Sequence, residues 1–181
     1  MIKKKLSSII NTLLFIGIFI PQLIGASEKN EKTGDILQIV IPTIGLGSTI
    51  FYEKELKGTN QFFKSLITTA IITKSLKIAT RKQRPNGECC QSFPSGHTSV
   101  AFMGAAFIHK RYGCRYSIPA YVGATFVGYS RVQVDKHFVE DVIAGAAVGI
   151  LSSFYFTKPY KGFIIDITVT NGYEIYLSQT L

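Results

Sequence analysis

Residues 138–156 read FVEDVIAGAAVGILSSFYF, an apolar run whose centre consists mainly of glycine, alanine and valine. In water, glycines weaken a helix because each one loses much backbone freedom on folding. In a membrane bundle, the same small residues allow helices to pack closely. The run therefore predicts one helix of a membrane-associated bundle.

Four further apolar segments precede this run and are also rich in small residues. They cover residues 36–52, 62–79, 98–108 and 116–132. Several are shorter than the ~20 residues of a full membrane span, so a bundle that is only partly embedded in lipid is an alternative. We expect an all-α protein, in which residues 28–161 form a helical bundle of five or six mostly membrane-embedded helices.

The two ends of the chain have other patterns. Residues 1–27 combine a basic start, an apolar stretch and small residues, which is typical of a signal peptide or a first membrane anchor. Residues 162–181 are rich in β-branched and aromatic residues around Asn171 and Gly172. This pattern predicts a C-terminal β-hairpin with a three-residue loop that places Val169 opposite Tyr173.

The formal net charge of +9 is distributed unevenly. Basic residues flank the apolar runs instead of covering one polar face, which argues against a nucleic-acid partner. The segments 1–5, 53–64, 109–115 and 158–161 are strongly basic, and their acids are Glu53 and Glu55. Alternating spans with this asymmetry place these segments in the cytoplasm and the other connecting segments outside it.

The cysteines Cys89, Cys90 and Cys114 are odd in number, and adjacent cysteines pair only with strain. We expect free thiols with packing roles.

The informative polar residues all fall on the side opposite the basic segments. Arginine binds a phosphate dianion through two parallel hydrogen bonds, and lysine supplies a compact charge. A helix that begins near residues 95–97, capped by Ser95 or Thr98, would add free N–H groups. The residues expected on this side are Lys77, Arg84, Ser95, Gly96, His97, Arg131, His137 and Asp141.

His137 and Asp141 are four residues apart and would share one face of a helix. A carboxylate bonded to one ring nitrogen fixes the tautomer and makes the other nitrogen a better nucleophile. His97, from another helix, can protonate a leaving oxygen. Each residue alone also has a structural interpretation, and His109, which has no evident partner in sequence, is expected to be structural. Because all of these residues are expected at the same end of the bundle, a functional site is favoured over separate structural roles.

Three motifs carry a resemblance to a known family. Lys77-x6-Arg84-Pro85, Pro94-Ser95-Gly96-His97 and Ser130-Arg131-x5-His137-x3-Asp141 resemble the three-part signature of the type 2 phosphatidic acid phosphatase superfamily, and more narrowly its bacterial membrane-associated lipid phosphatases. The resemblance implies metal-independent phosphoester hydrolysis without a cofactor. It also implies that His137 attacks phosphorus, that Asp141 supports it and that His97 is the general acid. The phosphate-binding residues would be Lys77, Arg84, Ser95, Gly96 and Arg131.

The favoured function is hydrolysis of a lipid phosphate monoester or diphosphate through a phosphohistidine. The expected partners are the lipid phosphate and membrane lipid, with no nucleic acid and no obligate protein partner. We expect a multi-pass protein of the bacterial inner membrane, with its site on the periplasmic or extracytoplasmic face. The alternatives are a secreted soluble nonspecific acid phosphatase of the same superfamily, a vanadate-dependent haloperoxidase and a non-catalytic phosphate-binding membrane protein.

Overall fold

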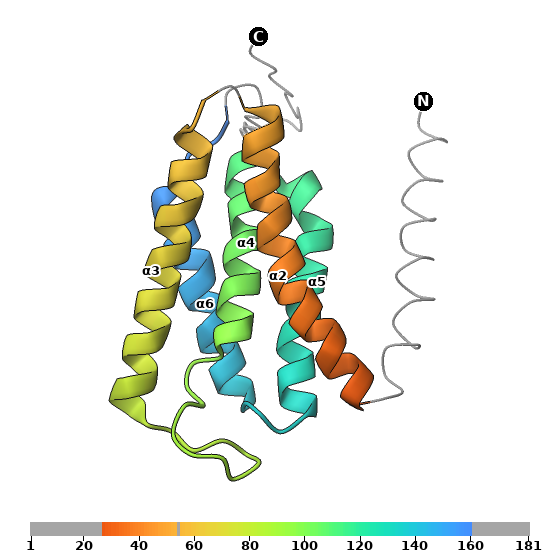
Figure 1. Ribbon diagram of the computed structural model, residues 1–181, viewed down its shortest axis with the longest axis vertical. Helices are drawn as coiled ribbons and strands as arrows, with labels where there is room; N and C mark the ends of the chain where they lie inside the picture. The colour runs from red at the N-terminus through yellow and green to blue at the C-terminus, as the bar shows by residue number, and fades with distance from the viewer. Residues whose placement is uncertain (1–26, 54, 161–181) are drawn as a thin grey trace, which may run out of the picture.

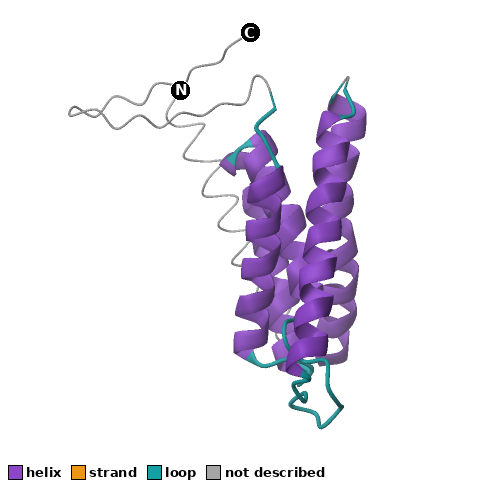
Figure 2. Ribbon diagram, turned by 90° about the vertical axis from the view of Figure 1, so that its left-hand side faces the viewer, coloured by secondary structure: helices purple, strands orange, loops and turns teal. Residues whose placement is uncertain are grey.

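All regular structure in the described part of the chain is helical. A computed structural model describes residues 27–53 and 55–160, and Figure 2 shows helices joined by loops throughout these ranges. The prediction of an all-α protein is therefore confirmed for these residues. Residues 1–26 and the predicted hairpin at 162–181 lie outside the described residues. The helices are α2 (Ser27–Tyr52), α3 (Lys57–Thr80), α4 (Gly96–Tyr112), α5 (Cys114–Gln133) and α6 (Val139–Phe156).

The helices form a bundle around α4, which contacts each of the other four (Figure 1). Successive helices run in opposite directions (Figure 1). The start of α2, the loop between α3 and α4 and the turn between α5 and α6 consequently meet at the lower end in Figure 1. This arrangement brings the predicted site segments to one end of the bundle.

The interior of the bundle is rich in small polar side chains, and its outside is apolar. The buried residues of α3 include Ser65, Thr69 and Thr73, whereas Ile67 and Ile71 of the same helix are exposed. Apolar side chains such as Phe62 are buried as well, but the exposed isoleucines distinguish this helix from those of soluble bundles, in which the apolar stripe faces inward. Small and hydroxyl-bearing residues at helix contacts are typical of bundles that pack in lipid.

Two helices are long and apolar enough to cross a membrane, namely α2, over Glu28–Tyr52, and α6. Of the others, α3 carries four lysines and α4 has only 17 residues. The expectation of five or six mostly embedded helices is thus supported for two of the described helices.

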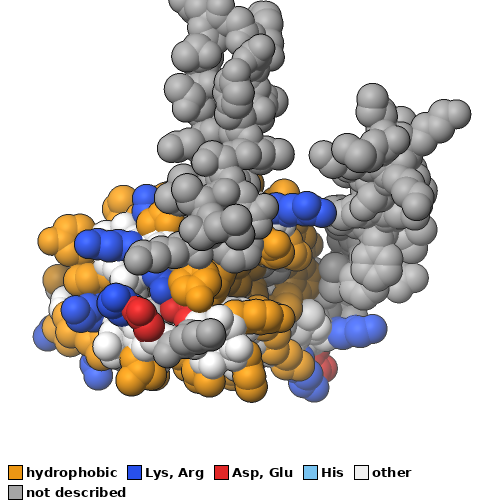
Figure 3. Space-filling model, turned by 90° about the horizontal axis from the view of Figure 1, so that it is seen from above, with side chains coloured by type: hydrophobic (Ala, Val, Ile, Leu, Met, Phe, Trp, Pro, Cys, Tyr) orange, Lys and Arg blue, Asp and Glu red, His pale blue; other side chains and the backbone are white. Residues whose placement is uncertain are grey.

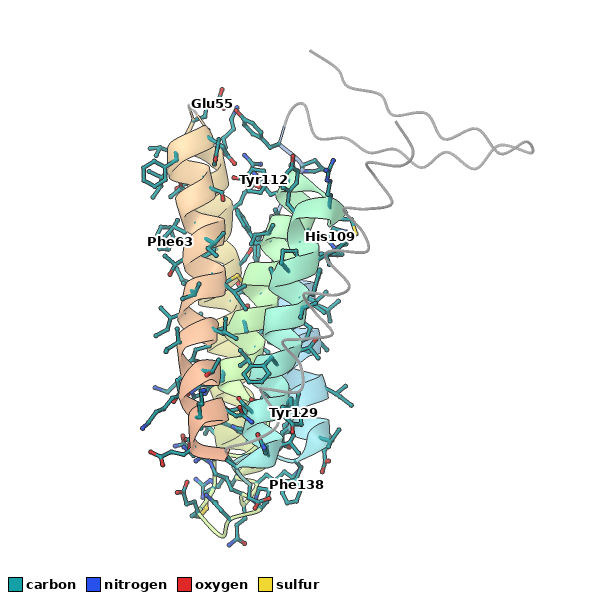
Figure 4. All side chains as sticks on the ribbon, turned by 90° about the vertical axis from the view of Figure 1, so that its right-hand side faces the viewer. Glu55, Phe63, His109, Tyr112, Tyr129 and Phe138 are labelled. Atoms are coloured by element: carbon teal, nitrogen blue, oxygen red, sulfur yellow. A yellow bond between two sulfur atoms is a disulfide. The ribbon has the colours of Figure 1, made fainter. Side chains whose placement is uncertain are left out.

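A buried ion pair closes the end opposite the predicted site. Arg111 of α4 donates from Nε to Glu53 at 2.7 Å, and a second guanidinium nitrogen binds the other carboxylate oxygen. The Tyr112 hydroxyl donates to the same carboxylate at 2.8 Å, and Arg111 also donates to the Lys158 carbonyl. These bonds join the ends of α2, α4 and α6. Figure 4 labels Tyr112 at this end, and Figure 3 looks down on it, with apolar side chains around the rim and cationic ones among them.

Helices α4 and α6 pack so closely that two positions of α6 have no room for a side chain. A Cβ at Gly145 would lie 2.5 Å from the Ser95 carbonyl oxygen. A Cβ at Gly149 would lie 2.7 Å from the Met103 backbone nitrogen, and closer still to the Ser99 carbonyl oxygen. Because the obstructing atoms belong to the backbone of α4, a side chain here can be accommodated only if the helices separate.

Gly149→Ala should therefore destabilise the bundle by about 1–3 kcal/mol, the usual cost of overpacking a core. Gly47→Ala is the matched control, since a Cβ at this position of α2 meets nothing within 4 Å. The control should be neutral or slightly stabilising, because alanine is the better helix former. Thermal unfolding in detergent measures both variants, and equal melting temperatures would contradict the close packing of α4 on α6.

Candidate active site

The start of α4 is the first component of the site. Ser95 occupies the N-cap position with an extended backbone, but no side chain caps the helix, contrary to our expectation for Ser95 or Thr98. The Thr98 hydroxyl instead donates to the Ser95 hydroxyl at 2.9 Å. The first N–H groups of a helix lack intrahelical acceptors and attract anions. Gly96 follows at this end, within reach of Lys77, since a Cβ on Gly96 would lie 3.9 Å from its Cε.

His137 and Asp141 come from the start of α6, but not from one helix as predicted. Phe138 is the N-cap residue and has an extended backbone, so His137 precedes the helix. Its Nδ1 lies 3.8 Å from Asp141 Oδ2, which is beyond hydrogen-bond distance. This buried Nδ1 has no hydrogen-bond partner in the described residues. The predicted pair is close in space, but the hydrogen bond between its members is not formed.

Other groups hold the Asp141 carboxylate. It accepts hydrogen bonds from Lys82 Nζ at 2.8 Å, from the Ser92 hydroxyl and from the Phe138 backbone N–H at 3.1 Å. The Asp141 backbone carbonyl also accepts a bond from the Ser95 N–H at 2.9 Å. Asp141 therefore links the loop between α3 and α4 to the start of α6, where Figure 4 labels Phe138. Lys82 and Ser92 were not predicted. The cationic stretch that contains Lys77 and Arg84 was a signal for Lys82, whereas nothing in the sequence pointed to Ser92.

Arg131 and His97 share a partner that sequence analysis missed. Asp35 Oδ1, on α2, lies 2.9 Å from Arg131 Nη1 and 3.2 Å from His97 Nε2. The Arg131 side chain is only 1% exposed and donates further bonds to the Glu31 carbonyl and the Ser130 hydroxyl. The position of Asp35 on the same side of the bundle as the motifs was the only signal for it in the sequence.

The remaining two cations lie on the loop side of the site. Lys77 donates to the Gln91 carbonyl. Arg84 Nη1 bonds to Glu88 at 2.6 Å, and its buried Nε has no partner in the described residues. The structure thus brings all eight predicted residues to one end of the bundle, with His109 far from them near the other end (Figure 4).

Neighbouring cysteines contribute to the same loop. The side chains of Cys89 and Cys90 lie next to each other in this loop. Cys114 is free and exposed. Within residues 27–53 and 55–160, no group of three or more His, Cys, Asp or Glu side chains is arranged to hold a metal ion.

The surroundings of His137 favour its neutral form. Burial lowers the pKa of the imidazole to about 4, and the charge of Lys77 acts in the same direction, whereas a backbone hydrogen bond with Ser92 opposes both. A neutral imidazole has a free lone pair, which a nucleophile or a base requires.

This shift in the pKa of His137 predicts a pH dependence of stability. Its folded-state pKa of about 4 lies below the usual imidazole value of 6.5, so the unfolded chain binds more protons between these values. The contribution of His137 to the free energy of unfolding is therefore present above pH about 6.5 and is lost as the pH falls toward about 4. His137→Gln should lose less stability than wild type on acidification. Denaturant unfolding at several pH values compares the two proteins, and parallel curves would contradict the shift.

Comparisons with known proteins agree with this arrangement. The family model of the PAP2 superfamily matches residues 59–163, which include all three motifs. A lipid A 1-phosphatase of Porphyromonas gingivalis is 45% identical over 78 residues, which are 41% of this chain and 18% of that protein. A lipid A 4′-phosphatase of Helicobacter pylori is 27% identical over 142 residues, which are 72% of this chain and 71% of that protein.

The crystal structure of Aquifex aeolicus LpxE has a similar fold. Its TM-score is 0.53 at 22% sequence identity, over 67% of this chain and 83% of that one. The chain spans less than a fifth of the Porphyromonas relative and somewhat over two thirds of the Helicobacter relative. Because the family model covers more than half of the 181 residues and contains every motif, the chain belongs to the PAP2 superfamily.

Proposed function

We propose that this protein hydrolyses a lipid phosphate without a metal ion, through a covalent bond between His137 and phosphorus. The observation that supports this most strongly is the convergence at one bundle end of a buried imidazole without a hydrogen bond at Nδ1, a second histidine and several cations. A site that only bound phosphate would need the cations but not the first imidazole.

The reaction proceeds in two steps. In the first, a nitrogen of neutral His137 attacks phosphorus, and the bond from phosphorus to the lipid oxygen breaks while His97 donates a proton to that oxygen. In the second, neutral His97 accepts a proton from water as the water oxygen attacks phosphorus. The bond to His137 then breaks, and inorganic phosphate leaves.

The cations and the helix start stabilise the charge that develops on the phosphoryl oxygens. Arg131, Arg84 and Lys77 approach from α5, from the loop and from α3, and the N–H groups at the start of α4 provide further donors. Arg131 uses three of its five N–H groups in bonds to α2 and to Ser130, which fixes its guanidinium and leaves donors for the phosphate.

Asp35 and Asp141 orient the two histidines. Burial and the charge of Arg131 lower the pKa of His97, and the Asp35 carboxylate, which faces His97 Nε2, opposes both and so helps to retain the proton that a general acid must donate. Lys82 and Ser92 hold Asp141 with its Oδ2 at 3.8 Å from His137 Nδ1, so the two atoms need to approach by about 1 Å to form a hydrogen bond. Catalytic hydrogen bonds are often long before substrate binds.

A lipid substrate and a membrane location agree with the apolar exterior of the bundle. Exposed isoleucines lie on several helices, including Ile39, Ile71 and Ile143, each at least 60% exposed. Water-soluble proteins rarely expose apolar surface so extensively, which makes the secreted soluble acid phosphatase the weaker alternative. The relatives act on lipid A, according to their names. With the basic segments in the cytoplasm, the site lies on the extracytoplasmic face.

The two histidines should respond differently to a change of leaving group. His137→Ala should lower turnover of every substrate at least about 10³-fold, because it removes the nucleophile. His97→Ala should lower turnover of a lipid phosphate about 10²–10⁴-fold. It should affect nitrophenyl phosphate far less, since nitrophenolate leaves without a proton. Asp35→Asn should follow the pattern of His97→Ala in milder form.

First-turnover rates on both substrates provide the measurement, because they separate chemistry from binding. The same pattern in both histidine variants would refute this division of roles. The assays contain a chelator, and loss of wild-type activity that a divalent ion restores would refute the metal-independent reaction.

The orientation predicts which cysteines a membrane-impermeant reagent reaches. Asn86→Cys, with the three native cysteines replaced by serine, should react in intact cells or spheroplasts. A second variant that keeps only the exposed Cys114, at the opposite end of the bundle, should react only after lysis. The reverse labelling pattern would place the site in the cytoplasm.

A further inference from the structure

A cavity extends from the phosphate site along the side of the bundle. Its volume is about 540 Å³, and it lies between α3, α4 and the loop that joins them. Lys77 and Gly96, two of the predicted phosphate-binding residues, line it. The cavity therefore borders the proposed phosphate site at these two residues, and a ligand bound in it can be part of the same substrate molecule.

Two further cations line this cavity beside Lys77. Lys74 is three residues before Lys77, so these two share one face of α3, and Arg81 lines the same cavity from the residue that directly follows the helix. The cations are distributed along about 10 Å of the helix axis. Every charged residue that lines the cavity is a cation.

These cations differ from most of their neighbours because no carboxylate compensates them. Within the described ranges, Lys74 and Arg81 form no ion pair, and Lys77 binds only a backbone carbonyl. Five other cations at this end have carboxylate partners, which are Lys32 with Glu28, Lys82 with Glu140 and Asp141, Arg84 with Glu88, Arg131 with Asp35, and Lys136 with Glu31. Of the cations at this end for which the described residues provide no carboxylate partner, Lys74, Lys77 and Arg81 line the cavity, and Lys29 lies outside it at the start of α2.

The rest of the lining is suited to a lipid. Ala70 and Val100 lie farther from the loop end than Lys77 and Gly96, and Ile78 lies between the cations. The cavity accordingly joins a cationic part next to the reaction centre to an apolar part along the bundle. An anionic lipid headgroup would fit the cationic part of the cavity, and the first carbons of the lipid chain would fit the apolar part.

We propose that Lys74 and Arg81 form a subsite for a second phosphate group on the substrate, so that the preferred substrate is a lipid with two phosphates. This rests on the function proposed above. The second phosphate is either joined to the first in a diphosphate or attached elsewhere on the headgroup. Both arrangements offer the same anionic chemistry to the two side chains, and a choice of substrates separates them.

The test compares three substrates in mixed micelles: a diacylglycerol monophosphate, a polyprenyl diphosphate and a disaccharide glycolipid with two separate phosphates. The double variant Lys74→Gln, Arg81→Gln should lose about 10–100-fold in kcat/KM on at least one two-phosphate lipid, since two charge-assisted bonds are lost. Its kcat/KM on the monophosphate should remain within about threefold of wild type. A loss on the polyprenyl diphosphate would indicate that the subsite binds the second phosphate of a diphosphate, and a loss on the glycolipid would indicate that it binds a separate phosphate.

Two further variants control for indirect effects. Lys64→Gln removes an exposed lysine from α3 outside the cavity and should leave all three rates unchanged. Lys74→Gln alone avoids Arg81, whose backbone ends α3 in the left-handed conformation, and should show part of the same selective loss. Equal losses on all three lipids, or no selective loss on either two-phosphate lipid, would overturn the subsite.

Binding separates failure of the subsite from failure of the proposed reaction. In His137→Ala, the affinity for the two-phosphate lipid should exceed that for the monophosphate, and Lys74→Gln with Arg81→Gln should abolish the difference. Such a difference in a protein that hydrolyses none of the lipids would refute the phosphatase and support the subsite. Equal affinities in a protein that hydrolyses them through His137 would refute the subsite alone.

Discussion

The close approach of α6 to α4 determines the geometry of the whole site. Gly145 lies against the Ser95 carbonyl, and the Ser95 N–H donates to the Asp141 carbonyl at 2.9 Å. These contacts place the start of α4, which carries His97, beside the start of α6, which follows His137. A side chain at Gly145 would separate the two helix starts, so the absence of a Cβ on α6 is a condition for a shared phosphate site.

Polar packing maintains this arrangement through the length of the bundle. The Thr73 hydroxyl of α3 donates to the Ser99 hydroxyl of α4 at 3.2 Å, one turn from the site. At the far end, Glu53, Arg111 and the Lys158 carbonyl join three helix ends. When the outside of a bundle is apolar, hydrogen bonds between its helices hold the helices together, as hydrophobic burial does in water. The site is thus supported by a scaffold that is fixed at both ends.

Most of the site was predictable because its residues are close together in three short motifs at helix ends. Lys77, His97, Arg131 and Asp141 were assigned to one end from the alternation of apolar segments, and the structure places them there. Asp35 was not predictable, because α2 meets α5 only in three dimensions and a single acidic residue in a charged segment has no motif around it. The direct contact between His137 and Asp141 was predicted on the basis that both lie in one helix, but the helix begins after Phe138 and His137 lies outside it.

The sequence by itself determined the helical class, the position of the motif residues at one end of the bundle and the family, because hydrophobic periodicity and motif spacing are local properties. Tertiary structure decided which carboxylate accompanies each side chain that is proposed to be catalytic. It assigned Asp35 to His97 and Arg131, and Lys82 and Ser92 to Asp141. It also decided which cations remain uncompensated, because pairing depends on distances of a few ångströms between helices that are remote in sequence, and no spacing along the chain encodes those distances.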